Sequence, residues 1–316
     1  MKISLITPVG KQPRSGNRTT ASRYARIFRE LGHGVRTAQA YDGGDAELMV
    51  AIHAWRSADS IERFHRQHPS APLVVVLAGT DIYRYLHSHP QATYRSMELA
   101  TTLVGLHGLV DRSVPDCFAT KLRVIYQSAE PLPVGKTPRG RHFDVLVAGH
   151  LRDEKDPLRA AYAVRSLPDA SRLRVVHFGS ALDRRWRSAA EAEMVRNRRY
   201  VWRGDVAHWR LRRAYGISRL LVLSSIIEGG ANVVSEAVAA KLPVVASDIE
   251  GAVGLLGADY AGYYRVGDTD DLRRVLRSAE DDAGFLSMLA RQCRARAPLF
   301  TPASERAAWR RLLREL

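Results

Sequence analysis

The sequence predicts an α/β protein with two doubly wound parallel sheets, in two domains that face each other across a cleft. Three observations support this fold class. Short apolar runs alternate with helix-periodic segments along almost the whole chain, which is typical of parallel βα units. The alternation stops at "PLPVGKTPRGR" (131–141), a stretch rich in Pro and Gly, and then resumes. A chain of 316 residues is also long enough to bury two hydrophobic cores.

The segment before this linker, residues 1–130, is expected to be the first domain. Its strands are expected at short apolar runs, which are typical of the buried strands of a parallel sheet. A helix is expected at "TTASRYARIFRELG" (19–32), where the apolar residues have helical spacing. The predicted strands of this domain are residues 2–7, 48–53, 73–78, 101–106 and 122–127.

The second domain is expected at residues 142–300. One of its helices is expected at 269–280, and another follows the loop at 228–231. Asn232 is predicted to be the N-cap of that second helix, because its side chain can accept a hydrogen bond from the first turn. The predicted strands of this domain are residues 143–149, 173–179, 200–204, 219–225 and 243–248.

Residues 301–316 form the last predicted helix. Thr301 is its expected cap, and Pro302 lies in the first turn, where a missing N–H group removes no helical hydrogen bond. The pattern of this segment is amphipathic, and we expect the helix to pack back on the first domain.

Composition and charge restrict the possible functions. The formal net charge is +15 and the isoelectric point is near 10.2, which points to nucleic acid, an acidic membrane surface or phosphorylated small molecules as partners. No block of like charges marks a nucleic-acid-binding tail. No apolar run approaches the roughly 20 residues that span a bilayer, and "MKISLITPVG" is interpreted as a strand rather than a signal peptide. We therefore expect a cytoplasmic protein without an integral membrane segment.

Disulfide and metal sites are not expected. Cys117 and Cys293 form no C-x-x-C pair. The histidines of "FHRQHP" and "HSH" lack a third ligand at suitable spacing. The D-x-D pattern in "GDTDD" (267–271) opens a predicted helix, where Asp is expected to be a capping residue. The sequence therefore predicts no metal and no cofactor.

The first loop of the second domain, "AGHLRDEKDP" (148–157), is predicted to bind a diphosphate. Ligands of doubly wound sheets bind beyond the carboxyl ends of the strands. Gly149 allows a sharp turn after a strand, and Arg152 and Lys155 place two cations before a helix. The alternative is a solvated turn, since basic residues are abundant in this chain.

A second loop, "EGGANVVSE" (228–236), has two carboxylates around a glycine pair. Gly229 and Gly230 would let the backbone approach a ligand closely, and the amides of residues 231–233 would point at an anion. Glu236 lies about 6 Å along the helix axis, at a rise of about 1.5 Å per residue. We predict that Glu236 accepts hydrogen bonds from a vicinal diol such as a ribose, and that Glu228 does the same for a sugar ring.

These two glutamates, together with "GHLRDEK" before them and "PVVASD" after them, resemble the C-terminal domain of GT-B retaining glycosyltransferases of family 4. "GHGV" (32–35) and "VVVLAGTDIY" (74–83) resemble that family's N-terminal motifs, so the resemblance covers nearly the whole chain. It implies that Glu236 binds the nucleotide ribose, and that the catalytic residues Glu228, Arg152 and Lys155 bind the donor sugar and the diphosphate. The implied nucleotide-sugar site comprises Gly149, His150, Arg152, Lys155, Gly179, Arg203, Glu228, Gly229, Gly230, Ala231, Asn232, Val233 and Glu236.

The chain departs from the family pattern at three positions. His150 stands where the family usually has an arginine, so Arg152 is expected to supply the cation instead. Ala78 replaces a histidine that normally contacts the donor sugar near the reacting carbon. Lys241 stands where a glycine usually precedes "PVV". The change at Ala78 argues against ordinary alcohol glycosylation.

The loop "TPVGKQPRSGNRTTA" (7–21) is the candidate acceptor site. Its three cations surround Gly16–Asn17, directly before a helix that Thr19 or Thr20 is expected to cap, which predicts a second anion site. The alternative is a basic surface loop. The predicted acceptor-binding residues are Lys11, Arg14, Gly16, Asn17, Arg18 and Thr19, with Thr80 and Asp81 from "AGTD".

The segment "SGNRTTASRYARIFRELGH" resembles one subgroup of the family, the selenosugar synthases of selenoneine biosynthesis. That resemblance implies transfer of a sugar from a UDP-sugar, of the UDP-GlcNAc or UDP-glucose class, to the selenium of selenophosphate. An anionic, soft nucleophile needs little help from a general base, which agrees with the missing histidine. Two alternatives remain: a family 4 enzyme that glycosylates an alcohol in cell-envelope glycan synthesis, and a basic nucleic-acid-binding protein.

Overall fold

The computed structural model describes residues 1–8, 16–132 and 141–316, and it divides the chain into two compact units. Most of the predicted linker, residues 133–140, lies outside the described residues. The sequence put the first boundary at residue 130 and the whole loop 228–230 in the second domain. The first unit instead comprises Met1–Gln127, Glu228–Gly230 and Pro302–Leu316, and the second comprises Ser128–Ile227 and Ala231–Thr301.

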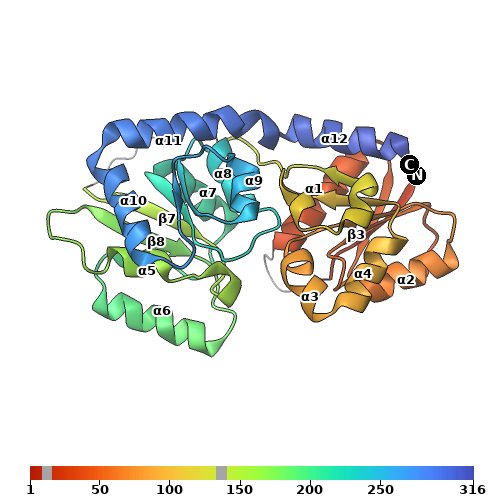
Figure 1. The fold of residues 1–316 in the computed structure, drawn as a ribbon, viewed down its shortest axis with the longest axis horizontal. Helices are drawn as coiled ribbons and strands as arrows, with labels where there is room; N and C mark the ends of the chain where they lie inside the picture. Colours follow the sequence, from red (N-terminus) through yellow and green to blue (C-terminus); the bar gives the residue numbers. More distant parts are fainter. Residues whose placement is uncertain (9–15, 133–140) are drawn as a thin grey trace. The chain divides into compact units, whose positions relative to one another are not determined.

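A six-stranded parallel sheet forms the centre of the first unit, in the order β2-β1-β3-β4-β5-β6 (Figure 1). All five predicted strands of this half are confirmed. The edge strand β2 has no counterpart among them, because it is largely exposed and lacks an apolar run. The strands are β1 (Lys2–Ile6), β2 (Gly34–Ala38), β3 (Leu48–Ile52), β4 (Leu73–Val76), β5 (Thr102–Gly105) and β6 (Leu122–Val124).

Helices flank this sheet, and the first of them begins earlier than the sequence suggests. The prediction that Thr19 or Thr20 caps the helix is wrong, because both residues lie inside α1 (Gly16–Glu30). The hydroxyl of Thr20 is buried and accepts a hydrogen bond of 2.8 Å from Nε2 of Gln127. The other helices of this part are α2 (Ala58–Gln67), α3 (Leu86–Ser88) and α4 (Pro90–Leu99), with a π-helical turn η1 (Asp81–Tyr85) after β4.

The second unit has its own six-stranded parallel sheet, in the order β12-β11-β10-β7-β8-β9 (Figure 1). The five predicted strands of this half are confirmed. Strand β12 has only two residues, which is too short for an apolar run to indicate it. The strands are β7 (Phe143–Ala148), β8 (Leu173–Phe178), β9 (Tyr200–Trp202), β10 (Leu220–Leu223), β11 (Val244–Ser247) and β12 (Tyr263–Tyr264).

Helix ends in the second unit agree with the sequence at one position and differ at another. Asp268 caps α10 as expected, since its side chain accepts hydrogen bonds from the N–H groups of Asp270 and Asp271. The prediction that Asn232 is an N-cap is wrong, because Ala231 occupies that position and Asn232 is the first helical residue. The helices are α5 (Arg159–Val164), α6 (Arg184–Arg196), α7 (His208–Ile217), α8 (Asn232–Ala239), α9 (Glu250–Leu256), α10 (Thr269–Asp281) and α11 (Ala283–Arg296).

The last helix, α12 (Pro302–Glu315), belongs to the first unit and packs on α1. The indole of Trp309 is fully buried and meets the rings of Tyr24 and Phe28 edge-on, at centroid distances of 4.8 and 4.9 Å. Beside them, Arg23 forms a 3.0 Å ion pair with the buried carboxylate of Glu305. The core of the first unit therefore requires the last residues of the chain.

We predict that Trp309→Ala lowers the free energy of unfolding of the first unit by about 3–5 kcal/mol, the usual cost of truncating a buried aromatic side chain. Urea unfolding followed by circular dichroism measures this. Trp209→Ala is the matched control, because Trp209 is 61% exposed and its loss should change stability by less than about 0.5 kcal/mol. Equal losses in the two variants would contradict the role of α12.

Candidate functional site

The loops that follow β7 and β8 run side by side in close contact, and this contact explains one predicted glycine. Gly179 has φ +150°, and a Cβ atom there would lie 1.9 Å from the carbonyl oxygen of Gly149. Gly179 is therefore required by backbone packing. Gly149 differs, since its φ is not positive and a Cβ there would meet no atom within 4 Å. Arg203 follows β9 with an exposed side chain, and its N–H donates to the carbonyl of His177.

A buried histidine that the sequence analysis did not select supports the Gly149 loop. His177 is 1% exposed, and its Nε2–H donates to the carbonyl oxygen of Gly149 at 3.0 Å. Its Nδ1 then accepts from the hydroxyl of Tyr200 at 3.1 Å. Burial lowers the pKa of His177 to about 4, so the ring is neutral at pH 7. The one signal in the sequence is a polar residue inside the apolar run "LRVVHFG".

The predicted diphosphate loop forms a tight turn that is attached to the next strand. Asp153–Lys155 is a single 3₁₀ turn, and Asp156 after it has φ +40°. The hydroxyl of Ser224, at the end of β10, lies 2.9 Å from the carbonyl of Lys155 and 3.0 Å from that of Asp156. The backbone N–H of Ile226 donates to the backbone carbonyl of Glu154 at 2.9 Å. These bonds hold the backbone of Lys155 against the strand that leads into the glutamate loop.

Arg152, directly before this turn, has an unsatisfied donor. Its Nε is buried and has no hydrogen-bond partner among the described residues. The nearest carboxylate oxygen paired with it, Oε2 of Glu154, is 3.9 Å away, beyond hydrogen-bonding distance. The side chain as a whole is 42% exposed. A buried N–H group on a cation that reaches solvent is a suitable donor to an anionic ligand.

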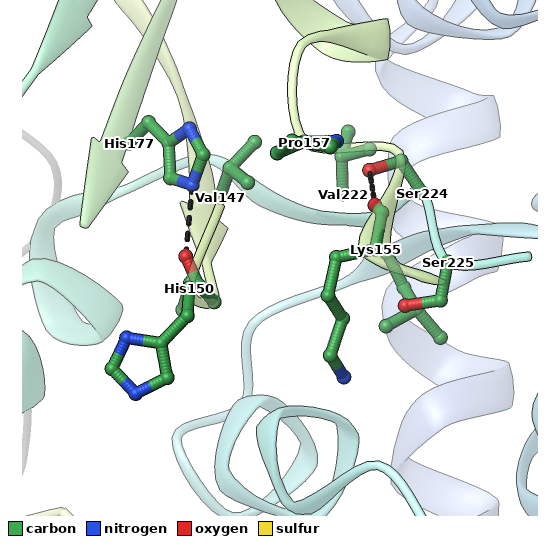
Figure 2. Close-up of a pocket in the computed structure, with 11 residues that line it drawn as sticks. Val147, His150, Lys155, Pro157, His177, Val222, Ser224 and Ser225 are labelled. Carbon is green, nitrogen blue, oxygen red and sulfur yellow. Dashed lines mark hydrogen bonds between the residues drawn. The ribbon is translucent and has the colours of Figure 1, made fainter. Parts of the chain in front are cut away.

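A small hollow lies at this edge of the second sheet (Figure 2). Residues after β7 and β10 line it, among them Gly149, His150, Lys155 and Ser225. Figure 2 shows the side chains of His150 and Lys155 extending in the same direction. Nδ1 of His150 accepts from the N–H of Ser180 at 3.1 Å, so a neutral His150 ring carries its proton at Nε2. The enclosed volume of about 20 Å³ holds roughly one water molecule, so a larger ligand would extend out of it.

A tyrosine on a different helix positions Glu236. The carboxylate of Glu236, on α8, accepts a hydrogen bond of 2.8 Å from the hydroxyl of Tyr215, on α7. Tyr215 is 3% exposed, and burial together with the nearby carboxylate raises its pKa well above the ordinary value of 10. The phenol therefore stays protonated and remains a donor. Tyr215 is a residue that sequence reasoning missed, because the two side chains lie 21 residues apart on separate elements.

The glycine pair after Glu228 packs against protein. Glu228–Gly230 belongs to the first unit. A Cβ atom on Gly229 would lie 2.3 Å from the backbone nitrogen of Gly79, and one on Gly230 would lie 2.5 Å from Cβ of Leu106. The interpretation that these glycines leave space for a ligand is therefore corrected, because close contact with the strand-end loop at Gly79 already requires them.

The predicted acceptor residues fall into three groups. Lys11 and Arg14 lie outside the described residues. Gly16, Asn17, Arg18 and Thr19 form the start of α1, whose first turn contains no acidic residue. Thr80 is half-buried at the end of β4 and bonds to His53 at 2.9 Å.

Asp81 is a correction, because its carboxylate is fully buried and cannot touch an acceptor. Its Oδ1 accepts from the N–H groups of Gly79 and Ile82, and its Oδ2 accepts from those of Ala54 and Ala78, at 2.7–3.2 Å. Asp81 therefore maintains the shape of the loop after β4. Any contact between that loop and a ligand must therefore come from residues other than Asp81.

The described part of the chain offers neither a metal-binding cluster nor a membrane-spanning helix. Residues 1–8, 16–132 and 141–316 contain no group of three His, Cys, Asp or Glu side chains arranged to hold a metal ion. Within the same residues, every helix is too short or too polar to cross a membrane.

Comparison with known proteins gives one family match and several similar structures. Residues 134–298 match the family model described as Glycosyl transferases group 1. No curated protein sequence matches the chain. HepE (Alr3699) of Anabaena, solved with UDP and glucose, has a TM-score of 0.79 at 16% identity, with 100% of both chains covered. A sucrose-phosphate synthase of Thermosynechococcus elongatus has a TM-score of 0.76 at 14% identity, covering 99% of this chain and 98% of that one. A glycosyltransferase of Rickettsia africae has a TM-score of 0.73 at 13% identity, with the same coverage.

We predict that the second unit loses stability as the pH falls from 6.5 to about 4. His177 has an ordinary pKa of 6.5 when unfolded and about 4 when folded, so in this range the unfolded chain binds the proton more readily. The contribution of the neutral ring is present above pH 6.5 and is lost toward pH 4, by about 2–3 kcal/mol. Urea unfolding at a series of pH values measures it.

The variant His177→Gln should flatten this pH dependence, because its amide can donate to Gly149 but does not titrate. His208→Gln, at an exposed position of the same unit, is the control and should retain the wild-type pH dependence. A wild-type slope in His177→Gln would contradict the prediction.

Proposed function

The chain belongs to the group 1 glycosyl transferases and has the GT-B fold, and on this basis we propose that it is a selenosugar synthase. In the proposed reaction it transfers a sugar from a UDP-sugar to the selenium of selenophosphate. The bond between the sugar C1 and the diphosphate oxygen breaks, a C1–Se bond forms, and UDP leaves with the electron pair of the broken bond.

The observation that carries the donor assignment is the unsatisfied, buried Nε of Arg152 beside Lys155 at the end of β7. A diphosphate supplies the acceptor oxygens that this donor lacks, and the two cations balance its charge. HepE, which has the same fold, was solved with UDP and with UDP-glucose, and this supports a UDP-sugar as donor.

In this proposal the two glutamates accept hydrogen bonds from hydroxyl groups of the donor. Glu236, oriented by Tyr215, accepts from the ribose diol, and Glu228 accepts from the transferred sugar. The backbone N–H groups at the start of α8, from Ala231 to Val233, face the phosphates. His150 contributes its Nε2–H at the same edge of the sheet.

In the proposed mechanism the enzyme lowers the barrier by stabilising the negative charge that develops on the leaving group. Negative charge grows on the β-phosphate oxygen as the C1–O bond breaks, and Arg152 and Lys155 are already positioned to stabilise it. These two cations supply the charge compensation that a metal ion supplies in other diphosphate sites, so we propose a reaction without a metal cofactor. The nucleophile is an anion, so no general base has to remove a proton from it.

The acceptor site is proposed at the start of α1. The N–H groups of Gly16, Asn17 and Arg18 and the Arg18 side chain favour a small, multiply charged anion, and no acidic residue in the first turn opposes it. Ala78 is consistent with such an acceptor, since the family's histidine is absent where an alcohol would be activated.

Incubation of the protein with several nucleotide sugars and several acceptors, followed by mass spectrometry of the products, tests the function directly. The expected product is the sugar bonded through C1 to the selenium of selenophosphate, or the free 1-selenosugar and phosphate once water has hydrolysed the Se–P bond. Glycosylation of a lipid or sugar hydroxyl, with no use of selenophosphate, would overturn the proposal in favour of a cell-envelope glycosyltransferase.

We predict that Glu236→Ala weakens UDP binding by roughly 1–3 kcal/mol, the size of a hydrogen bond to a charged group. Tyr215→Phe should weaken it by a smaller amount, because the carboxylate remains but loses the donor that orients it. Isothermal titration calorimetry with UDP measures both. Glu191→Ala removes an exposed carboxylate of the same unit and is the control. Unchanged affinity in Glu236→Ala would rule out the ribose contact.

We also predict that Arg18→Ala lowers kcat/KM for selenophosphate by about 10- to 100-fold, the equivalent of one lost charge-assisted hydrogen bond. UDP affinity should be unchanged, since the nucleotide site is on the second unit. Arg29→Ala is the matched control, because it removes the same charge from the other end of α1. Similar losses in the two variants would indicate a general effect of charge and contradict a site at the helix start.

A further inference from the structure

A second buried histidine, His53, lies where β3 ends and forms a hydrogen bond to the loop after β4. It is 1% exposed, and its Nε2 is 2.9 Å from the hydroxyl oxygen of Thr80. Its Nδ1 accepts from the backbone N–H of Arg56 at 3.2 Å, so this nitrogen carries no proton. The ring is therefore the Nε2–H tautomer and donates to Thr80. Burial lowers its pKa, which keeps the ring neutral despite Asp81 at 4.0 Å.

This arrangement is held by unusual local structure. His53 has φ +78°, in the left-handed region that side chains other than glycine rarely adopt. The loop opposite it is fixed by three N–H bonds to Asp81, which also accepts from the N–H of Ala54 next to His53, and the loop continues as the π-helical turn η1. Strained backbone and π-turns persist where the surroundings determine them, and both occur often at functional sites.

Because His53 donates to Thr80, the hydroxyl hydrogen of Thr80 is not used in this hydrogen bond. A hydroxyl has one hydrogen and two lone pairs, and His53 occupies a lone pair. Thr80 makes no other hydrogen bond in residues 1–8, 16–132 and 141–316, and its side chain is half-buried. The hydroxyl hydrogen therefore remains available to donate to a ligand oxygen.

Arg56 adds positive charge near His53, where burial and this charge both lower the pKa of the ring. It follows His53 by three residues, its side chain is exposed, and it forms no ion pair with a described carboxylate. Its guanidinium lies 5.9 Å over the ring of Tyr85, which stacks on Trp55 at 3.9 Å. A donor hydroxyl and an unneutralised cation, both in contact with the region around His53, favour an oxygen with negative charge and no hydrogen, which a phosphoryl group has and an alcohol lacks.

We propose that His53 is a positioning residue that makes the Thr80 hydroxyl a donor to a phosphoryl oxygen of the acceptor, and that Arg56 adds positive charge to the same region. The identity of that acceptor as selenophosphate rests on the proposed function. His53 itself does not touch the ligand. Its role is to fix the direction in which Thr80 donates, and so to favour phosphorylated acceptors over neutral alcohols.

A double-mutant cycle tests whether His53 acts through Thr80. Thr80→Val keeps the shape and removes the hydroxyl, and we expect it to raise the KM for selenophosphate about 10- to 100-fold. His53→Asn tolerates the positive φ but does not reach the Nε2 position, and it should give a similar rise. His53→Gln places an amide N–H near that position and should restore part of the loss. In the Thr80→Val background, His53→Asn should add less than about 2-fold.

The KM for the UDP-sugar should be unchanged in every variant, and Thr120→Val, at an exposed position of the same unit, should behave as wild type. Additive effects of His53→Asn and Thr80→Val, or a rise in the UDP-sugar KM instead, would overturn the inference while leaving the proposed function intact.

Calorimetry with thiophosphate separates the two proposals if the wild type does not use selenophosphate. Thiophosphate that binds the wild type and binds Thr80→Val at least about 10-fold more weakly would support the inference although the proposed function fails. Equal affinity in the two proteins, or no binding to the wild type, would overturn the inference.

Discussion

The buried carboxylate of Asp81 shows the constraint on which both units depend. A chain that leaves a buried parallel strand takes polar backbone groups out of the sheet, and each of these groups needs a partner. Asp81 pairs four N–H groups from two neighbouring strand ends, so one side chain determines the shape of the loop after β4 and of the segment after β3. The strained His53 and the hydroxyl of Thr80 keep their places because of it.

The second unit meets the same constraint with neutral side chains. His177 donates to the carbonyl of Gly149, Ser224 to the carbonyls of Lys155 and Asp156, and Ser247 to the carbonyl of Ser225. These bonds join the ends of adjacent strands into one edge. The backbone that carries Arg152 and Lys155 is therefore held by hydrogen bonds to the neighbouring strand end, and such preorganisation favours electrostatic stabilisation by the groups it carries.

Ion pairs offset part of the large positive charge of the chain. Many arginines are neutralised on the surface of the second unit, for example Arg165 by Glu193, Arg174 by Asp144 and Arg274 by Asp271. Such pairs add little stability in water, but they remove charge from the surface field. Arg152, at 3.9 Å from Glu154 and with an unsatisfied Nε, stands out by comparison.

The sequence by itself determined the two parallel sheets, because apolar runs of strand length depend only on which residues are buried. It also indicated the loop that carries Arg152 and Lys155 and the helix that carries Glu236, since the ends of parallel strands gather at one edge. The roles of individual side chains depended on the tertiary structure. The hydroxyl of Thr20 accepts a hydrogen bond from Gln127 and does not cap a helix. Gly229 has no room for a Cβ atom because it packs against Gly79. The residues that orient others, His53, His177 and Tyr215, have partners 21 to 28 residues away, and no local pattern records a hydrogen bond that forms only when separate elements meet.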